Sequence, residues 1–240
     1  MPDDIPLNRE TRTEDDGRTR APGRSPAPPN RARADGPYVS RGGIKLAAAL
    51  DAFGVSPAGS VCADLGCNVG GFTDCLLRGG AIRVYAIDTG YGALDYGLRR
   101  DARVVVMERT NALHVRLPEP VDLVVIDAGW TRQRRIVPAA ATLLRPGGQI
   151  ITLIKPHYEA DRRRLRKGVL DPNEAPAVTN RVVEDLARRG FEILGQTESP
   201  ITGDAGNRES LAWIRPRQDA VIYHAIDAKP GAPPARGKDE

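Results

Sequence analysis

The chain has 240 residues, of which 40% are hydrophobic and 28% charged, with a formal net charge of +4. This composition supports one globular domain and permits, without requiring, an anionic partner such as nucleic acid. No apolar run approaches the roughly 18 residues of a membrane-spanning helix, and the N-terminus lacks a secretory signal pattern. We therefore expect neither export nor membrane insertion, and we predict a cytoplasmic protein.

The cysteines and histidines indicate no metal site. The three cysteines lie between positions 62 and 75 at spacings that fit neither a zinc site nor a disulfide framework. Such cysteines are typical of a reducing compartment and of core or loop positions. The histidines are scattered, at positions 114, 157 and 224. We predict no bound metal.

Both ends of the chain differ in composition from its centre. Residues 1–36 are rich in Pro, Arg, Asp and Gly, and residues 228–240 have the same character. Segments with so few large apolar side chains cannot offset the entropy lost on ordering. We predict two disordered tails around one domain over residues 37–227.

Between the tails, nearly continuous apolar runs alternate with helical patterns, as in an α/β protein whose parallel sheet is covered on both faces. The final two strands are joined without a long helix, so we expect the last strand to insert antiparallel into a seven-stranded, mostly parallel sheet. In chain order the pattern predicts a helix over 44–53, a strand over 60–66, a helix over 72–77, a strand over 83–88, a helix over 93–100, strands over 103–108 and 121–128, a helix over 134–144, a strand over 149–156, a helix over 177–189, and strands over 191–196 and 211–216.

A glycine-rich segment, "ADLGCNVGGFTD", leads from the first strand into a helix. In open α/β sheets, ligands bind beyond the carboxyl ends of the strands, where strand order reverses. The spacing is not the dinucleotide pattern G-x-G-x-x-G, and tight packing is an alternative reason for the glycines. The candidate cofactor contacts in this segment are Asp64, Gly66, Asn68, Gly70, Gly71 and Phe72.

Polar residues also follow the next two strands. Asp88 ends the second strand, where an acid can accept hydrogen bonds from both hydroxyls of an adenosine ribose. Glu108, Thr110 and Asn111 follow the third strand, as candidate contacts to an adenine edge or as ordinary strand-exit residues.

Near the end of the predicted domain, "DAGNRE" resembles a tight turn that leads into the last strand and places Glu209 at its start. Taken alone, Glu209 fits a solvated turn better than a functional position. The segments "YVSRGGIKL", "DLGCNVGGFTDCLL", "AIDTGYGAL", "ERTNA", "LVVIDAGW", "LIKPHYE" and "GNRE", however, together resemble the FtsJ-like RNA 2′-O-methyltransferases, most closely the haemolysin A (TlyA) branch.

This resemblance implies a class I methyltransferase (Rossmann-like) fold, S-adenosylmethionine as cofactor, and a catalytic tetrad at Lys45, Asp127, Lys155 and Glu209, with Asp127 also at the cofactor. Two departures stand out. That branch carries an S4-type RNA-binding domain where this chain has its Pro/Arg-rich tail, and it tends to have Asp-Val-Ser-Phe where this chain has "DAGW" from Asp127.

Transfer of a methyl group to a hydroxyl requires in-line geometry and removal of a proton. Lys155 could act as the base if burial and the nearby cation Lys45 lower its pKa, while Asp127 and Glu209 oppose that shift. The resemblance implies this role, because the sequence itself gives no pKa.

Two arginine-rich segments follow the strands that carry Asp127 and Lys155, and we expect them to contact RNA phosphates at the same edge of the pocket. A solvated charged face is the alternative. Trp130 could stack on a base or pack under a loop. The candidate RNA contacts are Arg41, Arg132, Arg134, Arg135, Arg162, Arg163 and Arg164.

The sequence therefore predicts an S-adenosylmethionine-dependent methyltransferase acting on a ribose 2′-hydroxyl of RNA, with ribosomal RNA or a ribosomal subunit as partner. Two alternatives stay open: an RNA-binding or ribosome-assembly protein that retains the pocket with little turnover, and a methyltransferase with a non-RNA acceptor.

Overall fold

The computed structural model describes residues 36–129 and 131–217. The tails predicted over 1–36 and 228–240, apart from Gly36, lie outside the described residues, as does Trp130 with its proposed stacking role. Among the described residues, no helix is both long and apolar enough to cross a membrane.

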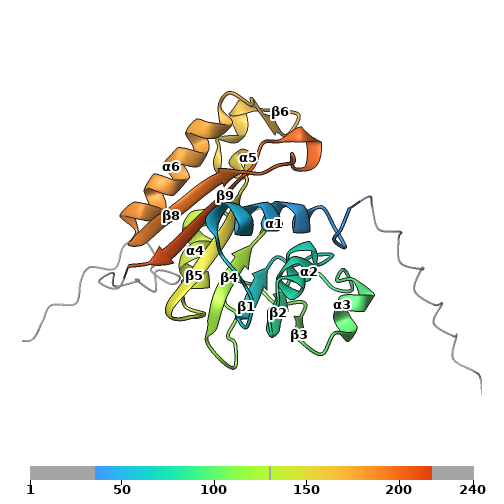
Figure 1. The fold of residues 1–240 in the computed structure, drawn as a ribbon. Helices are drawn as coiled ribbons and strands as arrows, with labels where there is room; N and C mark the ends of the chain where they lie inside the picture. The colour runs from blue at the N-terminus through green and yellow to red at the C-terminus, as the bar shows by residue number, and fades with distance from the viewer. Residues whose placement is uncertain (1–35, 130, 218–240) are drawn as a thin grey trace, which may run out of the picture. The chain divides into compact units, whose positions relative to one another are not determined.

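A seven-stranded sheet forms the centre of the molecule (Figure 1), with strand order β3-β2-β1-β4-β5-β9-β8. Strands β1 to β5 pair in parallel, whereas β9 runs antiparallel between β5 and β8. The predicted fold class and the antiparallel insertion of the last strand are both confirmed. The strands are β1 (Val61–Leu65), β2 (Arg83–Ile87), β3 (Val104–Met107), β4 (Val121–Ile126), β5 (Leu144–Ile154), β8 (Phe191–Glu198) and β9 (Ser210–Pro216).

Helices cover both faces of this sheet. The helices are α1 (Gly42–Phe53), α2 (Gly71–Arg78), α3 (Tyr96–Arg100), α4 (Gln133–Ala141), α5 (Pro156–Glu159) and α6 (Ala175–Arg188). Side chains of α1, α2 and α3 pack on one face, and side chains of α4 and α6 pack on the other. Along β1, Cys62 joins the first cluster and Ala63 and Leu65 the second, as the alternation of strand side chains requires.

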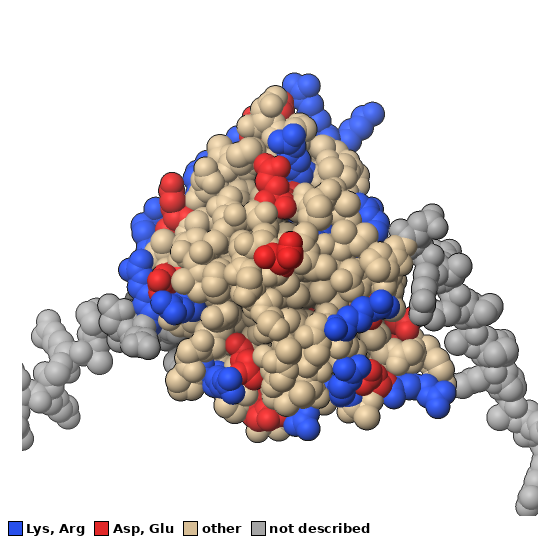
Figure 2. Space-filling view, viewed as in Figure 1, with Lys and Arg blue, Asp and Glu red and all other residues tan. Residues whose placement is uncertain are grey.

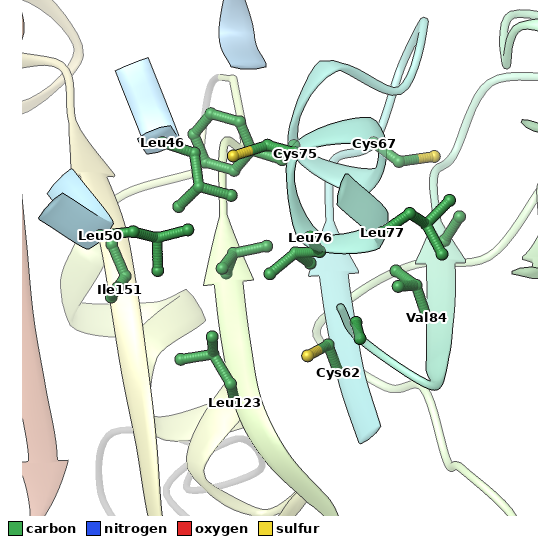
Figure 3. Close-up of a cluster of buried hydrophobic side chains, with 14 of the residues drawn as sticks. Leu46, Leu50, Cys62, Cys67, Cys75, Leu76, Leu77, Val84, Leu123 and Ile151 are labelled. Carbon is green, nitrogen blue, oxygen red and sulfur yellow. The ribbon is translucent and has the colours of Figure 1, made fainter. Parts of the chain in front are cut away.

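The three cysteines are free thiols buried in the first cluster (Figure 3). Cys62 lies on β1, Cys75 on α2, and Cys67 in the turn between them. These are the core and loop positions that the sequence predicts.

The predicted helix over 134–144 was wrong at its C-terminal end. Leu143 and Leu144 continue the apolar spacing of the helix, but α4 ends at Ala141. The Leu143 carbonyl accepts a hydrogen bond from Val121 N, and Leu144 pairs with Val121 at the start of β5. Pairing with β4 therefore overrides the helical pattern.

The helix predicted over 93–100 begins later, at Tyr96, because the Asp95 side chain caps it by accepting hydrogen bonds from Gly97 N and Leu98 N. A small hairpin and the 3₁₀ turn before it were not predicted. They are the turn η1 (Arg162–Arg164) and the strands β6 (Leu165–Arg166) and β7 (Val169–Leu170), which are too short to show alternation.

Candidate active site

A cavity of about 800 Å³ opens at the carboxyl ends of the parallel strands. Strand order reverses between β1 and β4, so this is the position where open α/β sheets bind ligands. One part of the lining comes from the segments that follow β1, β2 and β3, and another from Lys45, Asp127, Lys155 and Glu209. The structure thus brings the predicted cofactor segment and the predicted tetrad to one cavity.

The turn after β1 closely approaches the end of β4. Gly66 has φ of 89°, and a Cβ there would lie 2.6 Å from the Asp127 carbonyl oxygen. Asp127 N donates to the Leu65 carbonyl at 3.0 Å, which keeps the two strand ends together. A glycine is therefore required at position 66 both by conformation and by space.

Asp88 is oriented by the backbone around it. Its Oδ2 accepts from Asn68 N at 2.9 Å and its Oδ1 from Gly90 N at 2.7 Å. Each carboxylate oxygen has a second lone pair, so the group can still accept two hydrogen bonds from a ligand that enters the cavity. Asn68 reaches this position with a left-handed φ of 46°.

The predicted adenine contacts divide into two groups. Thr110 and Asn111 line the cavity, but Glu108 does not. The Glu108 carboxylate pairs with Arg99 and accepts from Gly92 N at 2.9 Å. Burial raises its pKa, but the Gly92 and Arg99 donors lower it further than burial raises it. Glu108 therefore secures the loop between β2 and α3, and its predicted contact to the adenine stays a prediction.

The remaining predicted contacts near α2 also differ in position. Phe72 and Gly71 line the cavity, whereas Asp64 is fully buried beneath it. Gly70 is absent from the lining, and a Cβ there would lie 2.4 Å from the Leu98 side chain, so this glycine permits packing against α3. Among the described residues, Asp64 and Gly70 therefore do not line the cavity, and the cofactor contacts predicted for them stay predictions.

The four tetrad side chains form two ion pairs. Lys155 Nζ lies 2.6 Å from Asp127 Oδ1 at the ends of β5 and β4. Lys45 on α1 donates to Glu209 Oε2, and both of these side chains are buried. Two cations and two anions balance in this region, and a buried pair of this kind avoids the free-energy cost of an unpaired charge.

The expected lowering of the Lys155 pKa was wrong for the free protein. Burial is the largest single influence and lowers this pKa, but Asp127, Glu209 and Tyr158 together raise it by more, so the net shift is upward. Without ligands, Lys155 is therefore held in its charged form.

A compact loop over residues 199–209, here called the Glu209 loop, positions Glu209. Ser199 N donates to the Glu209 carbonyl at 3.0 Å and closes the loop at its base. A Cβ on Gly203 would lie 2.1 Å from Glu209 Oε1, so the carboxylate occupies the space that a side chain at 203 would need. The segment "DAGNRE" is therefore more than a solvated turn, since it places Glu209 against Lys45.

The predicted RNA-contact arginines lie in three places. Arg41 lines the main cavity and donates to the Thr202 carbonyl, so it braces the Glu209 loop. Arg132, Arg134 and Arg164 line a second hollow of about 250 Å³ together with Glu159, Asp161 and Asp185. Arg135, Arg162 and Arg163 are exposed outside it.

The two arginine segments therefore meet, as predicted, but at this second hollow instead of the rim of the main cavity. Figure 2 shows Lys and Arg mainly at the margins of the face that α1 and α2 cover, with several projecting at the end where β6 lies.

Sequence reasoning missed a buried polar link beneath the site. Gln133 Nε2 donates to the Leu153 carbonyl at 3.0 Å, and its Oε1 accepts from Thr152 Oγ1 at 2.7 Å. Gln133 N donates to Glu159 on α5 at 2.7 Å. These bonds fix α4 to β5 and α5 on either side of Lys155. A lone Gln after "TR" gave no signal of this role.

Comparison with known proteins identifies the family to which this chain is similar. The family model described as FtsJ-like methyltransferase matches residues 38–215. The Mycobacterium tuberculosis protein named 16S/23S rRNA (cytidine-2′-O)-methyltransferase TlyA is 39% identical over 193 residues, which cover 77% of this chain and 71% of that protein. A Bacillus subtilis protein named as a candidate rRNA methyltransferase, YqxC, is 43% identical over 186 residues, or 74% of this chain. The chain spans 65% of YqxC, just under two thirds of its length.

Solved structures show the same fold. A Lactococcus lactis protein described as a candidate haemolysin aligns with a TM-score of 0.71 and 35% identity, covering 80% of this chain and 96% of that one. A Bradyrhizobium japonicum N-methyltransferase, NodS, aligns with a TM-score of 0.51 and 18% identity over 72% of this chain and 95% of that chain, which supports the fold alone.

Proposed function

The chain belongs to the FtsJ-like methyltransferase family, and on that premise we propose that it transfers a methyl group from S-adenosylmethionine to a ribose 2′-hydroxyl of ribosomal RNA. The single observation that carries this proposal is the convergence of the Lys155–Asp127 and Lys45–Glu209 pairs on a cavity that the glycine turn and Asp88 also line. The names of the TlyA and YqxC relatives support RNA as the acceptor.

The residues present fit this cofactor. Gly66 lines the cavity without a side chain that could obstruct a ligand, and Asp88 has free lone pairs suited to two ribose hydroxyls. Thr110 and Asn111 offer polar groups at the adenine side of the same cavity. S-adenosylmethionine supplies an electrophilic sulfonium methyl group to this arrangement.

Lys155 is the proposed base. The acceptor oxygen forms a bond to the methyl carbon as the carbon–sulfur bond breaks, and Lys155 Nζ takes the hydroxyl proton. This step requires neutral Lys155, whose pKa is raised in the free protein. S-adenosylmethionine would bring a positive charge into the cavity that Lys155 lines, and this charge would favour neutral Lys155. Asp127 holds the amine in place, and the Lys45–Glu209 pair positions the acceptor.

The raised pKa also favours a second candidate, an RNA-binding protein that keeps the cavity with little turnover. In that case the ion pairs would serve structure and binding only. A cytoplasmic location belongs to both candidates, and the free buried cysteines among the described residues fit a reducing compartment.

The experiment that tests the proposal incubates the protein with S-adenosylmethionine carrying a labelled methyl group and with ribosomal RNA or ribosomal subunits from cells lacking the gene. We expect labelled 2′-O-methylnucleosides after digestion, and none with Lys155→Ala. Label in the wild-type reaction that appears only on bases or protein would refute the ribose assignment. RNA binding without any transfer would support the second candidate.

A further inference from the structure

The β6–β7 hairpin is a basic projection next to the Glu209 loop. Its two-residue turn has left-handed φ values at both positions, 52° at Lys167 and 82° at Gly168, as hairpin turns of this length require. Arg166 and Lys167 are exposed at its tip, and η1 with its three exposed arginines precedes it. Leu165 and Leu170 anchor it on a small cluster with α6. The hairpin therefore exposes positive charge at its tip.

Asn207 joins this hairpin to the Glu209 loop. Its Oδ1 accepts from Leu170 N at 3.1 Å, and its Nδ2 donates to the Gly168 carbonyl at 3.2 Å. The residue is only 3% exposed. Figure 1 shows the loop before β9 beside the hairpin. One amide side chain thus satisfies two backbone groups of the hairpin.

The backbone of Asn207 makes a further hydrogen bond, within the Glu209 loop. Its carbonyl accepts from Gly203 N at 2.9 Å. Gly203 is the residue that closely contacts the Glu209 carboxylate, which in turn pairs with Lys45. A continuous set of contacts therefore runs from the hairpin through Asn207 and Gly203 to the Lys45–Glu209 pair.

We propose that Asn207 is a positioning residue through which RNA held by the β6–β7 hairpin fixes the Glu209 carboxylate, and with it Lys45, for methyl transfer. This inference rests on the proposed function. Phosphates of the acceptor RNA neutralise Arg166 and Lys167 at the hairpin tip. The hairpin then keeps one position, and the two Asn207 hydrogen bonds impose that position on the Glu209 loop.

The first test compares Asn207→Ala with Asn180→Ala, a control that removes an exposed asparagine from α6. Removal of two buried hydrogen bonds should lower the single-turnover rate at saturating RNA by about tenfold to a hundredfold. S-adenosylmethionine affinity should stay within about twofold of wild type, because Asn207 does not line the cavity. Asn207→Asp keeps an oxygen that accepts from Leu170 N, so its single-turnover rate should lie between those of Asn207→Ala and Asn180→Ala.

The second test asks whether the effect passes through the hairpin. Arg166→Gln combined with Lys167→Gln should lower both RNA affinity and the single-turnover rate in the wild-type background. In the Asn207→Ala background it should lower RNA affinity only, because the link to Glu209 is already broken. Additive effects on the rate would overturn the inference and reduce Asn207 to a packing role.

Three outcomes are distinguishable. An active wild type with a slow Asn207→Ala variant and a non-additive rate supports the inference. If the wild type is active and Asn207→Ala has the same rate, the inference is refuted and the proposed function stays intact. A wild type that methylates no RNA refutes the proposed function and the inference with it. Retained cofactor binding in each variant shows that it is folded.

Discussion

Asp64 illustrates how a single buried carboxyl couples the site to stability. Burial raises its pKa to about 7, although the Thr73 hydroxyl, which donates to Oδ2 at 2.7 Å, opposes the shift. In the unfolded chain an aspartate has a pKa of about 3.9. The folded state therefore holds a proton between about pH 4 and pH 7 that the unfolded state releases, so Asp64 reduces stability as pH rises through this window.

We predict that Asp64→Asn removes this pH dependence. The wild type should lose up to about 4 kcal/mol of unfolding free energy relative to the variant as pH rises from about 4 to 7. Urea unfolding of both proteins across this range measures the difference directly. If the unfolding free energies of the wild type and Asp64→Asn differ by the same amount at every pH, Asp64 is charged at neutral pH in the folded state.

The pH profile of methyl transfer is the second prediction at this scale. Because the free protein raises the Lys155 pKa, the pH dependence of kcat/KM should keep rising above the usual lysine value of about 10.4. Asp127→Asn removes the main group that stabilises charged Lys155, so the rising limb should move to lower pH even though the rate falls. Glu209→Gln should produce a smaller shift in the same direction, since Glu209 contributes less. If the rising limb of kcat/KM lies at the same pH in Asp127→Asn as in the wild type, the group that titrates is not Lys155.

At the scale of elements, the Glu209 loop depends on the absence of a side chain at Gly203. We predict that Gly203→Ala displaces the Glu209 carboxylate, because the new Cβ would lie 2.1 Å from Oε1. Methyl transfer should fall by about tenfold or more, with cofactor binding retained. In a Glu209→Ala background the same substitution should cost no further rate, and a further decrease there would place the effect elsewhere.

The elements also show where sequence reasoning succeeds and where it stops. All seven strands of the main sheet could be predicted, because the central strands are apolar throughout and the partly exposed edge strands β3 and β8 still contain apolar runs. The β6–β7 hairpin could not, since two-residue strands carry no periodic pattern. The tetrad residues were found at strand and helix ends, but the sign of the Lys155 shift depends on its 2.6 Å approach to Asp127, which no sequence pattern contains. The pairing of Glu108 with Arg99 on α3 was likewise not visible in the sequence.

On the scale of the whole molecule, the proposed cofactor contacts and the tetrad side chains come from different parts of the sheet. The segments after β1, β2 and β3 supply the Gly66 turn, Asp88 and Thr110, whereas the pairs with Asp127 and Glu209 lie at the ends of β4, β5 and the Glu209 loop. Variants in the two groups should therefore change different measurements.

Thermal unfolding checks this separation. A ligand at a hundredfold excess over its Kd stabilises the fold by about 2.7 kcal/mol, which corresponds to roughly 5–10 °C in Tm for a domain of this size. We predict such a shift with S-adenosylmethionine for the wild type and for Lys155→Ala, and little shift for Asp88→Ala. Asp51→Ala, which replaces an exposed aspartate on α1, is the matched control. An equal shift for Asp88→Ala would remove Asp88 from the cofactor site.

The placement of positive charge on the molecule leads to the last prediction. Arg162, Arg163 and Arg164 follow the carboxyl end of β5, between Lys155 and the hairpin, and Arg164 lines the second hollow. Arg83, Arg145 and Arg215 lie at the opposite edge, in ion pairs with Glu119, Asp122 and Glu192. The two sets carry equal charge, so replacing either by glutamine changes the net charge equally.

If RNA binds across the carboxyl edge, replacing Arg162, Arg163 and Arg164 leaves RNA phosphates without the arginines that neutralise them. Replacing Arg83, Arg145 and Arg215 does not. The plot of log K against log salt should then become shallower by about 0.7 to 0.9 for each phosphate no longer neutralised, or by roughly 2 to 3 for all three arginines. The second replacement should leave this slope nearly unchanged, because its effect on RNA is limited to screened, long-range charge. Cofactor affinity should be unaffected in both, since none of the six arginines lines the main cavity. Equal slopes for the two variants would show that RNA senses only net charge, and a larger change for Arg83, Arg145 and Arg215 would place the RNA on the other side of the sheet.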